Sequence, residues 1–419
     1  MNERLLHYIW QFQCYNRSSL KTCDTEDLQI IHPGTLNTNQ GPDFMNAKIR
    51  IGPTTWAGSI ELHINSSDWK NHKHSEDKNY NNVVLHVVWQ HDIDLQLPFA
   101  TLVLQDRVSK LLLKKYGELM MNRGFIPCKN NIHQVGEITW LAWKDRMFAE
   151  RLTAKSREVF SWLKMNNNHW EETLWWLIAK NFGLKLNSEA FLAIAQSIPV
   201  NILAKCKNQI HQLEALLFGQ AGLLEHRFSE DYPLLLQKEY HFLKKKYRLK
   251  TIPLSLNFLR MRPSNFPTVR LAQLAMLIHE TSHLFARIRS AVSLQSLMDS
   301  FNVTANDYWH YHYVFDEIAA FKKKKTGRQM TENILINTVI PLVYAYGSFL
   351  DEATMKQKAV QWSMEIKAEQ NSILSGFESL GIANKTAYDS QALLHLKNVF
   401  CDQKRCLDCA IGNKLISME

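Results

Sequence analysis

The chain has 419 residues, of which 46% are hydrophobic and 21% are charged, so its composition excludes a disordered protein. Its length favours two or three domains over a single modest core. The net charge of +9 favours an anionic partner, for which nucleic acid is the main candidate.

The first ten residues, MNERLLHYIW, carry charge where a secretory signal has an apolar run. The longest apolar stretch, Ile334 to Leu350, contains Asn337 and Pro341 and is too short for a membrane span. We therefore expect no membrane segment and a cytoplasmic location. Seven cysteines in such a chain favour free thiols or metal ligands over a disulfide framework.

The predicted elements indicate an α+β protein. Residues 1–130 predict a small mixed-sheet domain: a short helix (ERLLHYIWQF) is followed by the strand-like segments LQIIH, NAKIRI, WAGSIELHI and NNVVLHVVW, with turns rich in Gly, Pro and Asn between them. Residues 131–419 show apolar residues at helical spacing and predict a larger all-helical domain that carries a C-terminal cysteine cluster.

Titratable residues lie on two neighbouring strands of the N-terminal domain. Asp43 stands at a strand entrance, and Glu61 and His63 share one face of the next strand, since strand residues alternate. Carboxylates placed in this way suit Mg²⁺ or Mn²⁺, whose bound water can attack a phosphodiester. The alternative is that Asp43 caps a turn while Glu61 and His63 form a structural polar network.

This constellation resembles the PD-(D/E)XK nuclease superfamily. The resemblance implies a restriction-endonuclease-like core, with Asp43 and Glu61 as metal ligands and His63 at the position of the usual lysine. His63 would activate or orient water, and Glu3 in the first helix could add a carboxylate, as in some members. The histidine is a departure from the pattern, because near neutral pH it lacks a fixed positive charge.

The polar stretch SSDWKNHKHSEDKNY brings further candidate ligands. His72 and His74 could chelate one zinc or iron ion if the backbone is extended, and Asp68, Asp77 and His86 lie nearby in sequence. A hydrated loop with incidental histidines is the alternative. Convergence of these histidines with the carboxylates would give a metal hydrolase site with mixed ligands.

A second motif occurs in the helical part. The string His279-Glu280-Thr281-Ser282-His283 is an HExxH match that resembles the zincin metallopeptidase signature. On one continuous helix, both histidines could reach a Zn²⁺ ion. No third ligand follows at the metzincin spacing, so a zinc metallopeptidase is the second alternative function.

Basic residues surround this motif. Arg260, Arg262 and Arg270 lie in a stretch interrupted by prolines, together with Phe266, and could bind phosphates or stack on a base. Capping of helices or pairing with carboxylates is the alternative role.

The C-terminal segment CDQKRCLDCAIGN holds Cys401, Cys406 and Cys409 at C-x4-C-x2-C spacing. Three thiolates in one short loop suit Zn²⁺ or an iron–sulfur cluster. The fourth ligand is left open among Cys128, Cys14, Cys23 and His395. Some nucleases of the superfamily named above close an iron–sulfur cluster with one distant cysteine and a C-terminal triplet, at another spacing.

Several long strings, among them NTNQGPDFMNAKIRIG, RMRPSNFPTVRLAQLA and CLDCAIGN, are similar over nearly the full length to an uncharacterised bacterial family, a domain of unknown function. That resemblance implies a cytoplasmic bacterial protein and brings no activity. The leading expectation is a metal-dependent nuclease-like protein. A non-catalytic nucleic-acid-binding or scaffold protein on a degenerate nuclease core is the first alternative.

Overall fold

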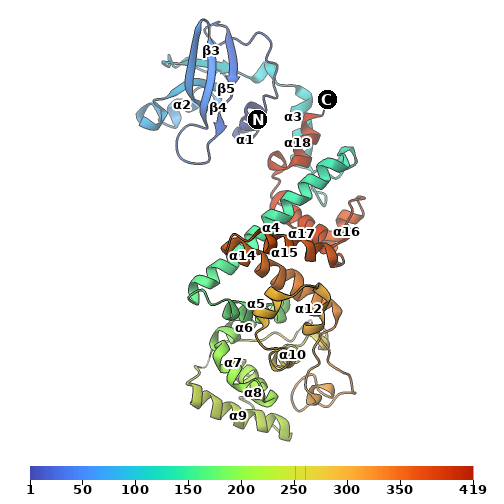
Figure 1. Ribbon diagram of the computed structural model, residues 1–419. Helices are drawn as coiled ribbons and strands as arrows, with labels where there is room; N and C mark the ends of the chain where they lie inside the picture. The colour runs from blue at the N-terminus through green and yellow to red at the C-terminus, as the bar shows by residue number, and fades with distance from the viewer. Residues whose placement is uncertain (251, 260, 419) are drawn as a thin grey trace. The chain divides into compact units, whose positions relative to one another are not determined.

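The structure is a computed structural model that describes residues 1–250, 252–259 and 261–418. The chain divides into two compact units. The N-terminal unit comprises Met1–Trp143, Ser379–Gly381 and Leu396–Glu419, and the helical unit comprises Lys144–Glu378 and Ile382–His395. A curled mixed sheet followed by a mainly helical part confirms the α+β class (Figure 1).

The N-terminal unit is built on a mixed sheet with the order β1-β3-β4-β5-β6; Figure 1 labels β3, β4 and β5. Strands β1, β3 and β4 form an antiparallel meander, and the short strand β2 pairs with β3. Strands β5 and β6 then run parallel to β4 and to each other. The bounds of the strands are β1 Leu28–His32, β2 Thr35–Leu36, β3 Phe44–Ile51, β4 Thr54–Asn65, β5 Val83–Gln90 and β6 Ala100–Val103.

Strand β4 is buried on both faces over residues 58–63, which explains how it can carry titratable groups away from solvent. Ile60 and Leu62 enter the main core, against which α1 (Glu3–Gln11) packs. The opposite face carries Glu61 and His63 and is also buried. It is covered by the segment that follows β4, which contains α2 (Asp68–Asn71) and the 3-10 helices η1 (His74–Glu76) and η2 (Lys78–Tyr80).

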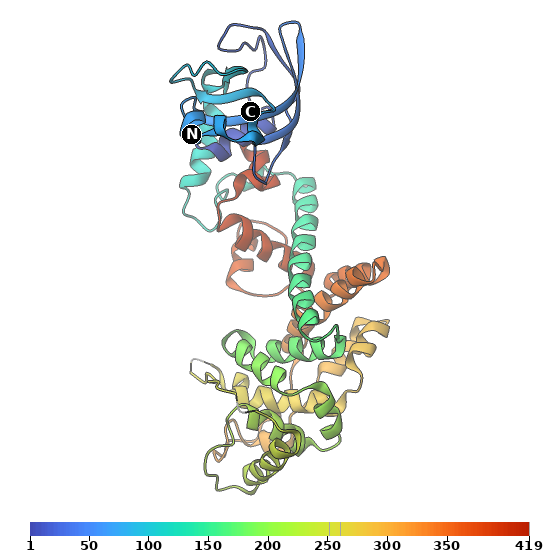
Figure 2. The same ribbon diagram turned by 90° about the vertical axis from the view of Figure 1, so that its left-hand side faces the viewer.

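The C-terminal segment belongs to this same unit, whereas the sequence placed it with the helical part. Helix α18 (Ala410–Ser417) packs beside α3 (Lys110–Met121), as Figures 1 and 2 show. Leu407 and Ile416 enter the core that α1 and the sheet share. Burial of these apolar side chains returns the chain end to the N-terminal unit over a long sequence separation.

The helical unit has its own core, in which tryptophan side chains are fixed by hydrogen bonds. Trp175, for example, is buried and donates its indole N–H to Ala195 and Ile198 carbonyls, both at 3.0 Å. The remaining helices are α4 Glu137–Met165, α5 Trp170–Phe182, α6 Leu184–Ser197, α7 Val200–Cys206, α8 Ile210–Gln220, α9 Asp231–Tyr247, α10 Pro267–Glu280, α11 Leu284–Ser290, α12 Leu294–Phe301, α13 Arg328–Ile334, α14 Ile340–Phe349, α15 Ala353–Glu365, α16 Ser372–Glu378 and α17 Ala387–His395. Within the described ranges, none of the helices combines the length and apolar character needed to cross a membrane.

Candidate metal centre

Three histidine side chains meet over the inner face of β4. The Nε2 atom of His63 lies 3.2 Å from Nδ1 of His72 and 3.3 Å from Nε2 of His74. One ring nitrogen from each of the three residues lies within 4.8 Å of the others. A single imidazole nitrogen with two nitrogen neighbours at such distances is typical of residues that share a metal ion.

Glu61 adds an oxygen to the same cluster. Its Oε1 atom lies 3.3 Å from Nε2 of His74 and 3.6 Å from Nε2 of His63. An ion about 2.1 Å from each ligand atom would hold neighbouring ligands about 3.0 Å apart in octahedral and about 3.4 Å apart in tetrahedral geometry. The measured separations of 3.2–3.6 Å therefore suit an ion shared by the three imidazoles, with Glu61 beside the nitrogens of His63 and His74.

The loop reaches the strand through a local reversal of the backbone. Lys73 has a left-handed conformation (φ 58°) between His72 and His74, so the two imidazoles do not project from an extended strand. Trp69 is buried beneath the loop, with its ring centre 5.2 Å from that of His74 and 5.4 Å from that of His86. The buried indole therefore fixes the position from which the loop histidines face β4.

A further histidine stands behind the cluster. His86 on β5 is fully buried, and its Nε2 atom lies 2.8 Å from Nδ1 of His63. This contact leaves Nε2 of His63 to face the other ligands, as outer residues do around bound metals. In sequence His86 lies only near the other candidate ligands, and the parallel pairing of β4 with β5 brings it to His63.

The electrostatics of the cluster follow from burial. Desolvation, with Asp43 and Glu3 nearby, raises the pKa of Glu61 to about 9, against the lowering effect of the backbone N–H of Asp43. Desolvation and neighbouring histidines lower the pKa of His63 to about 3 and that of His86 to about 4. The pKa of His74 is lowered for the same reasons. His63, His74 and His86 are thus neutral, which is the form that binds metals.

Asp43 stands beside Glu61 and is held by reciprocal backbone bonds. The N–H of Asp43 donates to Oε2 of Glu61 at 3.0 Å, and the N–H of Leu62 donates to Oδ2 of Asp43 at 3.0 Å. The same Oδ2 atom lies 3.2 Å from Nε2 of His7 on α1. Sequence analysis missed His7, although it lies one helical turn beyond Glu3 on the same face of α1.

The structure therefore rearranges the expected set of ligands. Glu61 faces His63 and His74 through Oε1, while Asp43 pairs with His7 and is about a quarter exposed. His63 was expected to act on water, but neither of its nitrogens is free: Nδ1 contacts His86 and Nε2 faces the cluster.

Asp68 and Asp77 accept hydrogen bonds from backbone N–H groups near their own positions in the chain. Asp68 accepts the backbone N–H of Asn65, and Asp77 caps η2 by accepting the N–H of Asn79.

The C-terminal cysteines form a separate cluster, and the structure brings Cys128 to them. The sulfurs of Cys128, Cys401, Cys406 and Cys409 interact electrostatically in every pairing. Burial raises the pKa of Cys128 and Cys406 to about 12 and also raises those of Cys401 and Cys409. His395, another candidate fourth ligand, lies in the helical unit with its Nε2 atom 3.4 Å from Glu150 Oε2.

The proposed arginine clamp is wrong for Arg270. This side chain is buried on α10 and donates to Gln273 Oε1 at 2.8 Å and to Asn265 Oδ1 at 2.5 Å, so it cannot bind a phosphate of nucleic acid. Arg262 is exposed just before Pro263, and Arg260 lies outside the described residues.

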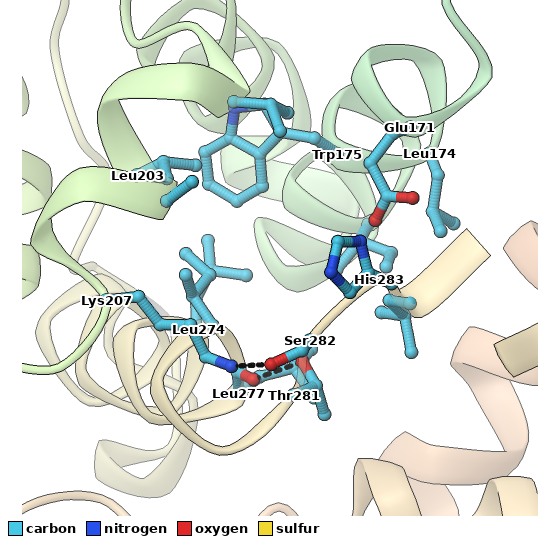
Figure 3. Close-up of a pocket in the computed structure, with 15 residues that line it drawn as sticks. Glu171, Leu174, Trp175, Leu203, Lys207, Leu274, Leu277, Thr281, Ser282 and His283 are labelled. Atoms are coloured by element: carbon cyan, nitrogen blue, oxygen red, sulfur yellow. Dashed lines mark hydrogen bonds between the residues drawn. The ribbon is translucent and has the colours of Figure 1, made fainter. Parts of the chain in front are cut away.

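The expected single helix through HETSH is also wrong. Helix α10 ends at Glu280, and His283 has a left-handed backbone (φ 51°) before α11. His279 Nδ1 lies 2.7 Å from the carbonyl of Lys207, whereas His283 lines a mainly apolar cavity of about 360 Å³ beside Glu171 (Figure 3). The two histidines therefore do not share the helical face that a zincin requires.

Comparison with known proteins identifies the family. The family model described as protein of unknown function (DUF2851) matches residues 3–372, which is most of the chain, and the chain belongs to this family. The match confirms the expected membership in a family of unknown function. It includes the cluster on β4 and Cys128, and it ends before Cys401. No curated protein and no solved structure matches the chain.

Proposed function

We propose that the chain, as a member of this family, is a metal-dependent nuclease whose centre is formed by Glu61, His63, His72 and His74. The observation that carries the proposal is the convergence of Glu61 Oε1 with Nε2 of His63 and of His74 at 3.3–3.6 Å. A buried carboxylate among neutral imidazoles is costly without a cation, and a divalent ion removes that cost.

The ligand set favours a transition metal over Mg²⁺. Imidazole nitrogens suit Mn²⁺, Fe²⁺ and Zn²⁺, whereas Mg²⁺ prefers oxygen ligands and retains its waters. Among these we favour Mn²⁺, because four protein ligands leave two positions open in octahedral coordination. One open position would take the attacking water, whose pKa a divalent metal lowers, and the other would take a phosphate oxygen.

Asp43 is the residue best placed to act on that water. Its carboxylate is partly exposed, and its link to Glu61 runs through two backbone hydrogen bonds. The Nε2 atom of His7 lies 3.2 Å from Oδ2 of Asp43. We assign Asp43 and His7 to positioning water, and we assign His63 to the metal.

The order of elements supports the nuclease assignment. A helix, an antiparallel meander, a segment with short helices and then a parallel strand is the order that the resemblance to the PD-(D/E)XK superfamily implies. Asp43 directly before β3 and Glu61 on β4 correspond in sequence order to the two acidic residues that this resemblance implies.

The loop above the centre offers a route for a polyanion. His72 is exposed on the loop side of the cluster, and Lys70, Lys73 and Lys78 are exposed on the same segment. Lysines around a metal would attract phosphate and orient the scissile bond.

The test is a cleavage assay with the full-length protein, stripped by a chelator and reloaded with Mn²⁺, Zn²⁺ or Mg²⁺. Labelled single- and double-stranded DNA and RNA are the substrates. Cleavage should be supported best by Mn²⁺ and fall about 100-fold or more in Glu61→Gln and in His74→Ala. Glu76→Gln changes an exposed carboxylate of the same loop and serves as the matched control, with activity unchanged.

One observation favours a second candidate, a non-catalytic nucleic-acid-binding protein with a structural zinc. Glu61 is only 5% exposed and His63 only 1%, and four ligands would close a tetrahedral zinc site. Tight zinc binding with no cleavage under any metal would favour this candidate. Cleavage that persists in Glu61→Gln and His74→Ala would reject both.

A further inference from the structure

We propose that Cys128, Cys401, Cys406 and Cys409 bind a [4Fe–4S] cluster that fastens the C-terminal segment to the N-terminal unit. This inference concerns a different set of residues from the centre on β4 and does not depend on any nuclease activity.

The first argument is convergence across the sequence. Cys128 follows α3, whereas the other three cysteines lie at the far end of the chain. Residues around them pack together: Lys397 Nζ lies 5.1 Å from the ring centre of Phe125, and Lys404 Nζ donates to the carbonyl of Met120. Each of the four sulfurs interacts electrostatically with the other three, so the four side chains lie in one region of the unit.

The second argument is the way the protein surrounds the sulfurs. Cys406 and Cys409 are buried, and Cys128 and Cys401 are half-buried. The sulfur of Cys409 accepts the backbone N–H groups of Ile411 and Gly412 at the start of α18. Such N–H donors stabilise metal-bound thiolates and set the potential of a cluster.

Gly412 shows that this close approach is built into the backbone. A Cβ atom at this position would lie 2.2 Å from the carbonyl oxygen of Cys406, so no larger residue fits while α18 stays in place. The glycine thus allows the helix start to lie directly against the loop that carries Cys406 and Cys409.

Positive charges complete the surroundings. Arg4 and Lys404 act on the sulfur of Cys406 against the opposite effect of Asp408, and Lys397 acts on that of Cys401. Four thiolates around a cluster carry net negative charge, which these cations would balance.

The spacing of the sulfurs favours a cluster over a single zinc ion. Four thiolates on one zinc, each about 2.3 Å from it, lie roughly 3.8 Å apart. Over the part of the chain that the structure describes, no three of these sulfurs lie within 4.8 Å of one another. A [4Fe–4S] cluster suits a wider set, because each sulfur binds its own iron at a separate corner.

The test starts from full-length protein purified without oxygen. Wild type should contain about four irons and about four acid-labile sulfides per chain, with a broad visible absorbance that bleaches on reduction. Cys128→Ser and Cys406→Ser should each lose most of the iron. Cys23→Ser, in the same unit, and Cys206→Ser, in the helical unit, are the matched controls and should keep it.

The visible spectrum and metal content of the wild-type protein test the proposal even if a variant fails to fold. Zinc in place of iron, or neither metal, in the wild-type protein would overturn the proposal. Retention of full iron by Cys128→Ser, with an unchanged circular dichroism spectrum, would overturn the assignment of the fourth ligand.

Discussion

His63 Nδ1 and His86 Nε2 lie 2.8 Å apart between neighbouring parallel strands, with both rings buried. The contact occupies the nitrogen of His63 that points away from the loop. It therefore fixes the ring so that Nε2 faces His72, His74 and Glu61. The metal binding that we propose for this cluster depends on that orientation.

Loss of His86 should weaken the metal centre without removing a ligand. We expect His86→Ala to lower the affinity for Mn²⁺ by about 10- to 100-fold, as outer residues of metal sites do. Isothermal titration of the chelator-treated protein measures the change. His133→Ala, an exposed histidine of the same unit, is the control and should bind Mn²⁺ as wild type does. Equal affinities in the two variants would contradict the orienting role.

Removal of the metal should destabilise the N-terminal unit. A ligand that binds only the folded state at 100 times its Kd adds about 2.7 kcal/mol. Melting followed through tryptophan fluorescence should shift upward by a few degrees on addition of Mn²⁺, because Trp69 lies against His74. His74→Ala should abolish the shift. A shift of the same size in that variant would show that Mn²⁺ acts elsewhere.

Glu214 should make the helical unit less stable as the pH rises. Its carboxyl is fully buried, and burial raises its pKa to about 7 despite hydrogen bonds from Tyr232 and Trp309. Glutamate in the unfolded chain has a pKa near 4.5, so between pH 4.5 and pH 7 the folded protein holds a proton that the unfolded chain has lost. The contribution of protonated Glu214 to the stability of the fold is therefore complete below about pH 4.5. It disappears as the pH rises through about 7.

Glu214→Gln should therefore be more stable than wild type at pH 8, by a few kcal/mol at most. Urea unfolding of both proteins at pH 5 and pH 8 measures the difference. A wild-type stability that rises between these two values, with no change in the variant, would contradict the raised pKa.

Substitution of Arg270 should affect stability, whereas substitution of a lysine in the segment that follows β4 should affect the affinity for nucleic acid. Because Arg270 is buried and bonded to Gln273 and Asn265, we expect Arg270→Gln to cost about 1–3 kcal/mol of stability and to leave affinity for nucleic acid unchanged. Lys73→Gln should weaken binding and lower the salt dependence by about one unit of slope, if the loop contacts phosphate. Fluorescence anisotropy over a range of salt concentrations tests both, and the reverse pattern would place the interface in the helical unit.

Local patterns predict much of the fold. Alternation along WAGSIELHI predicts the strand that the structure shows as β4, and the helical spacing of DYPLLLQKEYHFLKKKY predicts α9, Asp231–Tyr247. These elements depend on neighbours in sequence, so their periodicity is visible without tertiary information. The same approach fails at HETSH, where periodicity continues but the backbone leaves the helix after Glu280.

The candidate centre depends on contacts that no local pattern contains. His72 and His74 reach His63 through the left-handed backbone of Lys73 and the packing of Trp69, whereas the sequence suggested an extended chelating pair. Cys128 is likewise selected from several candidates only by the return of the C-terminal segment to α3. Tertiary packing determines both the position of the loop histidines and the selection of Cys128, and local periodicity in the sequence does not encode that packing.

The metal centre on β4 is tested most directly by anomalous scattering from crystals of the protein loaded with Mn²⁺ and recorded at the manganese edge. We predict one strong peak within about 2.3 Å of Nε2 of His63 and His74, Nδ1 of His72 and Oε1 of Glu61. No peak among these four atoms, or manganese bound at another place in the N-terminal unit, would contradict the central claim.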